Sequence, residues 1–107
     1  MSPRGIVLWW RAVRDRRRYE LATSLMLALP GSPVLHYGDE IGMGEDLSLK
    51  GRDAVRTPMQ WSPDDGGGFS TAPRERHVRP IVENGAYGYR RLNVRDQRGD
   101  PESLLNW

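Results

Sequence analysis

The stretch RRRYELATSLMLALPGSPVLHY, residues 16–37, gives the clearest indication of the fold class. Its first part predicts a helix, because Leu21, Leu25 and Ala28 recur at helical spacing. Other apolar residues lie beside this row, so the apolar band is wide, as expected of a helix that packs on a sheet. The Pro-Gly pair after Leu29 is expected to end the helix.

A strand is predicted directly after this helix. Residues 34–37, VLHY, form a short apolar run between the Gly31-Ser32-Pro33 turn and Gly38. A helix, a tight turn and a buried strand together form an αβ unit, which favours an α/β fold with a parallel sheet.

Little regular structure is predicted beyond this unit. Residues 38–89 show no second long helix and no convincing strand. Roughly fifty irregular residues far exceed the usual connection of about 4–6 residues, and such loops tend to be functional or disordered. A last helix is predicted to begin with Asp100 as its N-cap, Pro101 in the first turn and Glu102 in a favourable acidic position.

The domain organisation is expected to be incomplete. Residues 1–15 show no clear periodic pattern and are interpreted as an atypical N-terminal segment, whereas residues 16–107 are interpreted as part of one domain. The chain ends at Trp107, soon after the last predicted helix begins, which is typical of a truncated chain. Apolar residues make up 37% of the sequence, which is lean for a core at this length.

Composition argues against several classes of function. The absence of cysteine excludes disulfide scaffolds, thiol nucleophiles and cysteine-bound zinc. His36 and His77 do not have metal-ligand spacing, so neither a metal site nor a cofactor is expected. The net charge is only +2, and acidic residues interrupt the basic run at residues 11–20, so no nucleic-acid partner is expected. The apolar run Ile6–Trp10 is too short for a signal peptide or a membrane span, which favours a cytoplasmic protein without a membrane partner.

Two acidic pairs, Asp39-Glu40 and Glu45-Asp46, follow the predicted strand. The ends of strands are where open sheets and barrels build their sites. Retaining chemistry on a glycosidic bond needs two carboxyl groups about 5–5.5 Å apart that face each other. Neighbouring residues of an extended chain point to opposite sides, so Asp39 and Glu40 do not readily form such a pair. The favoured interpretation is that these carboxylates brace loops or neutralise arginines.

The segment RDAVRTPMQW, residues 52–61, combines guanidinium groups with a large aromatic side chain. A guanidinium group offers a rigid fork of donors for carboxylates or paired hydroxyls. Trp61 can stack on a sugar or wedge a loop onto a core. The residues alone favour the simpler interpretation, in which Arg52 and Arg56 form surface ion pairs and Trp61 packs. The glycine-rich DDGGGF, residues 64–69, lacks the ending of a phosphate loop and is predicted to be a flexible turn.

Three segments taken together carry a family resemblance: GSPVLHYGDEIGM (31–43), RTPMQW (56–61) and YGYRRLNVRDQRGDPESLLNW (87–107). They resemble the α-amylase superfamily of (β/α)8-barrel glycoside enzymes. RTPMQW is typical of its α-glucosidase, oligo-1,6-glucosidase and trehalose synthase branch, and the last segment is similar to trehalose synthases (maltose α-D-glucosyltransferases). The resemblance covers about residues 16–107.

This resemblance implies a fold and a set of site residues. The chain would hold helix seven, strand eight, the long loop after strand eight and the start of helix eight of a TIM barrel. Arg56 would contact the non-reducing glucose in the innermost subsite. Tyr37, Asp39, Glu40 and Trp61 would support the site. The substrates would be maltose, trehalose or related α-glucosides, with no cofactor.

The resemblance also implies that the reacting groups are absent from this chain. The family's nucleophilic aspartate, its acid/base glutamate and its His-Asp pair follow strands four, five and seven, which are not present. VENGAYG, residues 82–88, has Gly85 and Ala86 in place of that His-Asp pair and is interpreted as a loop. No catalytic residue is therefore expected. Part of an α-glucosidase or oligo-1,6-glucosidase, and a non-catalytic chain that binds sugar or another subunit, remain alternatives.

Overall fold

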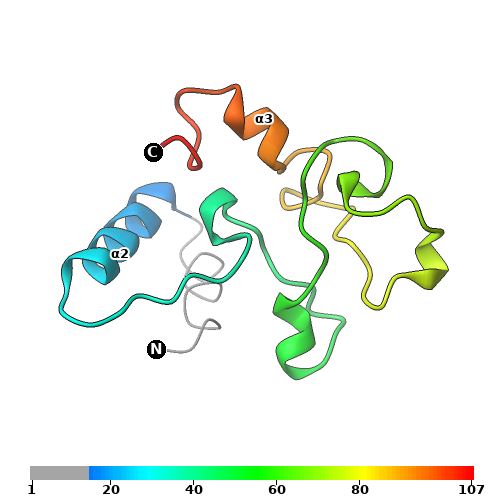
Figure 1. Ribbon diagram of the computed structural model, residues 1–107, viewed down its shortest axis with the longest axis horizontal. Helices are drawn as coiled ribbons and strands as arrows, with labels where there is room; N and C mark the ends of the chain where they lie inside the picture. The colour runs from blue at the N-terminus through cyan, green and yellow to red at the C-terminus, as the bar shows by residue number, and fades with distance from the viewer. Residues whose placement is uncertain (1–14) are drawn as a thin grey trace.

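The computed structural model describes residues 15–107, and most of the predicted N-terminal segment lies outside these residues. The helices are α2 (Arg16–Ala28), the short 3-10 helices η1 (Asp39–Ile41), η2 (Gly51–Val55), η3 (Asp65–Gly68) and η4 (Arg74–Arg76), and α3 (Val94–Arg98). In Figure 1, α2 lies at one end of the molecule, and irregular chain connects the other elements. None of the helices within residues 15–107 has the length and apolar character needed to cross a membrane.

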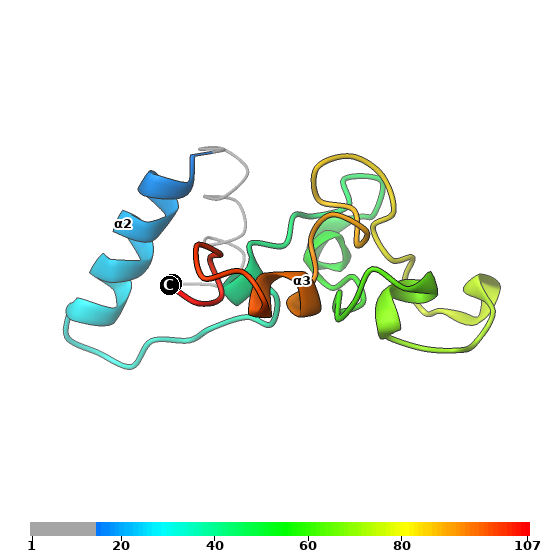
Figure 2. The same ribbon diagram turned by 90° about the horizontal axis from the view of Figure 1, so that it is seen from above.

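The first predicted helix is confirmed as α2. It begins after Asp15, whose carboxylate accepts a hydrogen bond from the Arg17 backbone N–H at 2.9 Å. It ends at Leu29, which has an extended backbone just before the Pro-Gly pair. The end of the chain lies beside α2 in both views (Figures 1 and 2), where Tyr19 and Trp107 line a common cavity of about 150 Å³. Tyr19 is the one buried side chain of the helix.

The predicted strand at residues 34–37 does not form. Val34 and Leu35 are 59% and 62% exposed, and residues 15–107 contain no strand. A strand is held by a ladder of hydrogen bonds to a neighbouring strand, and the described part of the chain supplies no neighbour. The apolar pattern therefore marks a segment suited to a buried strand, but the parallel sheet of the predicted αβ unit is not present here.

The last helix was predicted in the wrong place. Asp100 accepts a hydrogen bond from the Glu102 backbone N–H at 3.0 Å, as a cap would, but residues 101–106 form turns and a bend. The reason lies in Gln97, whose side-chain Oε1 accepts the Leu105 backbone N–H at 3.1 Å. The backbone carbonyl of Gln97 also accepts from the Ser103 hydroxyl at 2.6 Å. These bonds to Gln97 hold the chain end in turns.

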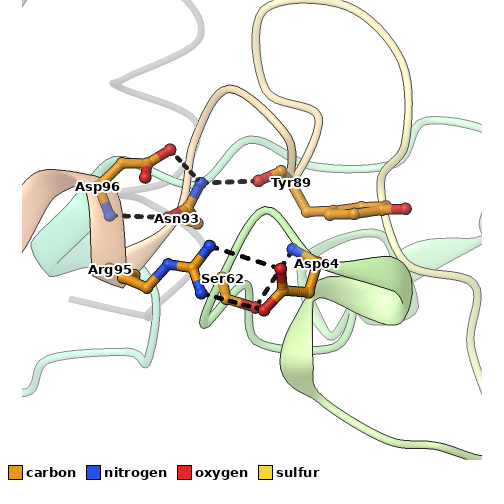
Figure 3. Close-up of polar contacts among 6 residues, drawn as sticks. All are labelled: Ser62, Asp64, Tyr89, Asn93, Arg95 and Asp96. Carbon is orange, nitrogen blue, oxygen red and sulfur yellow. Dashed lines mark hydrogen bonds and ion pairs between the residues drawn. The ribbon is translucent and has the colours of Figure 1, made fainter.

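The observed helix, α3, begins at Asn93, which is fully buried. Its side-chain Oδ1 accepts the Asp96 backbone N–H, and its Nδ2 donates to the Tyr89 carbonyl, both at 2.9 Å (Figure 3). On the same figure, the guanidinium of Arg95 binds both carboxylate oxygens of Asp64, at 3.1 and 3.4 Å. These contacts join α3 to the segment that carries the glycine-rich turn.

The core includes residues of the segment 56–61. Gln60 is fully buried, and its Nε2 donates to the carbonyls of Tyr87 at 3.0 Å and Leu92 at 2.6 Å. The first backbone N–H groups of α3 donate to the carbonyls of Gln60 and Trp61, each at 3.0 Å. These hydrogen bonds fix the segment to the N-terminal end of α3. The apolar cluster beside it consists of Ile41, Met43 and Met59, with Leu92, Val94 and Leu105 packed against it.

The glycine-rich turn is held in place and is not a loose loop. The Gly67 carbonyl accepts the backbone N–H groups of Trp61 at 2.8 Å and Ser62 at 2.9 Å. Gly67 has a φ of 65°, and a Cβ there would collide with the side chain of Ile81. The turn was predicted from sequence, but its packing against Trp61 was not.

Candidate functional site

The acidic pair after residues 34–37 lies in the turn that contains η1. The Asp39 carboxylate is buried and accepts the His36 backbone N–H at 3.0 Å, and the Tyr19 hydroxyl donates to the Asp39 carbonyl at 2.8 Å. The Glu40 carboxylate accepts the Gly38 backbone N–H at 2.9 Å. Both acids therefore bond the backbone of their own loop, which supports the interpretation that they brace it.

Burial raises the pKa of Asp39 from 3.8 to about 6 and outweighs the hydrogen bond from His36, which lowers this pKa. The nearby charge of Glu40 raises the pKa of Asp39 slightly further. Burial also raises the pKa of Tyr19, and the charges of Asp39 and Glu40 act in the same direction.

The folded chain therefore binds the Asp39 proton more tightly than the unfolded chain does. The protonated Asp39 contributes about 1–3 kcal/mol to the free energy of unfolding. This contribution is fully present below about pH 4 and is lost as the pH rises through about 6. Asp39→Asn cannot ionise at this position. We therefore expect the free energy of unfolding of the variant, minus that of the original chain, to be larger at about pH 7 than at about pH 4.5, by that amount. Urea unfolding of both chains at the two pH values measures this, and an equal difference at both pH values would contradict it.

Four of the five predicted site residues line one cavity of about 490 Å³: Tyr37, Glu40, Arg56 and Trp61. The other lining residues are Pro58, Met59, Phe69, Val78 and Arg79. The exception among the predicted residues is Asp39, which lines the smaller cavity beside α2. Glu40 lines both cavities, whereas Asp39 lines only the smaller of the two.

Hydrogen bonds to backbone carbonyls hold the side chain of Tyr37 and the backbone of Arg56 in this cavity. The Tyr37 hydroxyl donates to the Thr57 carbonyl at 2.8 Å, which ties the η1 turn to the 56–61 segment. The Arg56 backbone N–H donates to the Asp53 carbonyl at 3.0 Å and closes η2. Burial raises the pKa of Tyr37, and the charges of Arg79 and Arg56 oppose that rise, so both guanidinium groups act on this phenol.

Apolar surface forms the rest of the wall. Trp61 and Phe69 are each 50% exposed, and Val78 is 88% exposed. Exposed aromatic rings in one cavity with two guanidinium groups suit a sugar, which presents apolar ring faces and paired hydroxyls. Glu40 is the one carboxylate that lines this cavity among residues 15–107, so the described residues do not supply the opposed pair that retaining glycoside chemistry needs.

Sequence reasoning missed three lining residues: Phe69, Val78 and Arg79. Phe69 directly follows the glycine-rich turn and is the only phenylalanine of the chain, which is a signal that could have been used. Arg79 lies in PRERHVRP, residues 73–80, where its partner is not evident from local spacing. Within residues 15–107, no group of three or more acidic or histidine side chains is placed to hold a metal ion.

The sequence profile of the α-amylase catalytic domain matches residues 2–107. The chain therefore belongs to the α-amylase family of catalytic domains. The resemblance carried by GSPVLHYGDEIGM and RTPMQW is thereby confirmed at the level of the family.

Among known relatives, the chain is 55% identical to a trehalose synthase/amylase of Mycolicibacterium smegmatis over 93 residues, which cover 87% of this chain and 16% of that protein. It is 53% identical to a trehalose synthase of Thermus thermophilus over 93 residues, covering 87% of this chain and 10% of that protein. It is 37% identical to maltase A2 of Drosophila melanogaster over 103 residues, covering 88% of this chain and 17% of that protein. The chain thus spans about a sixth or less of the length of these curated relatives.

Proposed function

We propose that this chain is the sugar-positioning part of a trehalose synthase-type barrel that interconverts maltose and trehalose in the cytoplasm. The observation that carries the proposal is that Arg56 and Trp61 of RTPMQW line one cavity with Tyr37. The identity of 53–55% to trehalose synthases supports the same branch of the family. In the assembled barrel, α2 would be helix seven, residues 34–37 would be strand eight, and α3 with the turns after it would lead into helix eight.

The proposed reaction is a retaining transfer of glucose within one site. An aspartate attacks the anomeric carbon of the non-reducing glucose, and a glutamate protonates the leaving glucose. The anomeric hydroxyl of the freed glucose then attacks the glucosyl–aspartate ester; the glutamate takes the hydroxyl proton, and the aspartate leaves as a carboxylate. A closed pocket limits hydrolysis by water. Polypeptide outside this chain would supply both carboxyl groups. Arg56 would hold the non-reducing glucose by donating to its hydroxyls.

A hydrolytic function is the main alternative. An α-glucosidase shares RTPMQW but passes the glucosyl group to water. The fly maltase is 37% identical to this chain, well below the two trehalose synthases, and this difference favours the isomerising enzyme. A non-catalytic chain that binds sugar or another subunit is a further alternative.

A chimeric enzyme tests the proposal. The 93 aligned residues of the Thermus thermophilus trehalose synthase are replaced by those of this chain, and the purified chimera is incubated with maltose. We expect trehalose as the main product, with the unmodified synthase as the control. Glucose without trehalose, from a chimera that has the circular dichroism spectrum of the parent, would favour the α-glucosidase alternative instead.

A further inference from the structure

We propose that Arg79 is a second sugar-binding residue of the cavity and that it contacts the second glucose ring of maltose, the ring next to the one assigned to Arg56. This inference rests on the proposed function. It concerns a residue outside RTPMQW and outside the segments that carry the family resemblance.

The position of Arg79 is fixed by the same short helix that fixes Arg56. The Arg79 Nη2 donates to the Asp53 carboxylate at 3.1 Å, and Asp53 lies in η2. The carbonyl of Asp53 accepts the backbone N–H of Arg56. Asp53 therefore holds the guanidinium group of Arg79 and the backbone of Arg56. A guanidinium group that is already held favours binding, because it reduces the ordering that a ligand must impose.

The surroundings of Arg79 are those of a binding group. Its side chain is 31% exposed, and its Nε is buried without a hydrogen-bond partner among the described residues. It lines the cavity together with Val78, while Phe69 and Trp61 contribute aromatic surface from two other segments. A cavity of about 490 Å³ lies within the range of about 300–1,000 Å³ that is usual for small-molecule sites.

Two arginines that line one cavity can serve two neighbouring rings of a sugar. They come from separate segments of the chain, and the charge of each one lowers the pKa of Tyr37, which lines the same cavity. A planar guanidinium donates to two neighbouring hydroxyls at once, which a flexible ammonium does not do as well. The simpler alternative is that Arg79 only forms an ion pair with Asp53, in which case its replacement has little effect, as for most partly exposed pairs.

The test compares a two-ring sugar with a one-ring sugar. The 107-residue chain is labelled with ¹⁵N, and the indole signal of Trp61 is followed by NMR during titration with maltose and, separately, with methyl α-glucoside. The variants are Arg79→Gln and Arg79→Lys. The matched control is Arg76→Gln, an exposed arginine of η4 in the same loop. Backbone amide spectra establish that each variant keeps the fold.

We expect Arg79→Gln to raise the dissociation constant for maltose roughly tenfold, the effect of losing a hydrogen bond from a charged donor. Methyl α-glucoside should bind as before, and Arg76→Gln should change neither sugar. Arg79→Lys should weaken maltose binding by a smaller factor, because it keeps the charge and loses the planar fork.

Three results would overturn the inference, and they separate it from the proposed function. If Arg79→Gln binds maltose as the original chain does, Arg79 is only a partner of Asp53, and the proposed function stands. If both sugars lose affinity equally, Arg79 does not serve the second ring. If neither sugar moves the Trp61 signal of the original chain, the cavity is not a sugar site and the proposed function fails together with the inference.

Discussion

Replacing Arg56 by alanine in the chimeric synthase is expected to lower kcat/KM for maltose by about 100-fold. Arg56 lines the cavity, and its backbone is fixed at the end of η2. A guanidinium that donates to two hydroxyls of the reacting glucose holds the ring in position for attack, so its loss removes both binding energy and alignment. Steady-state kinetics with maltose measures the change.

Arg52→Ala is the matched control for this prediction. Arg52 lies in the same short helix, is exposed and does not line the cavity. Its replacement should change kcat/KM by less than about twofold, as expected of a surface charge. Equal losses for the two variants would mean that η2 matters for folding alone. No loss for Arg56→Ala would mean that Arg56 does not contact the sugar.

The second large effect is on stability. Gln60→Leu is expected to lower the free energy of unfolding of the chain by about 2–4 kcal/mol. The substitution keeps the approximate size of the side chain but removes the Nε2 that donates to the carbonyls of Tyr87 and Leu92. Because Gln60 is fully buried, water does not readily replace these bonds. Urea unfolding followed by circular dichroism measures the loss.

Asn84→Leu provides the comparison, since Asn84 is exposed on a turn of the segment that Gln60 holds in place. It should change the free energy of unfolding by less than about 0.5 kcal/mol. A Gln60→Leu chain as stable as the original would show that the contact between the 56–61 segment and α3 does not depend on this amide.

The candidate site residues were named from two recognisable segments, and their role in binding a sugar stays a prediction. Tyr37 and Glu40 from one segment and Arg56 and Trp61 from another line one cavity, although neither spacing nor composition brings them together. The absence of Asp39 from this cavity was not predictable, because it depends on the conformation of the η1 turn. Arg79 could not be found from local pattern, since its partner Asp53 lies 26 residues earlier.

Only part of the fold was predictable from the sequence. The pattern in residues 16–28 identified α2 correctly, because helical hydrogen bonds are local. The strand at residues 34–37 depends on a neighbouring strand, and no local pattern supplies one. The start of α3 was missed although Asn93, three residues before Asp96, is a capping signal; the similar signal at Asp100 was preferred, and bonds to Gln97 keep that region in turns.

An NMR time course of the 107-residue chain with maltose distinguishes sugar binding from catalysis, because one sample reports both the Trp61 indole signal and the anomeric signals of the sugar. A cavity that positions a sugar but lacks the opposed carboxylates predicts that maltose shifts the Trp61 signal and remains maltose. An unmoved Trp61 signal, or the appearance of trehalose or glucose above a blank without protein, would contradict the account.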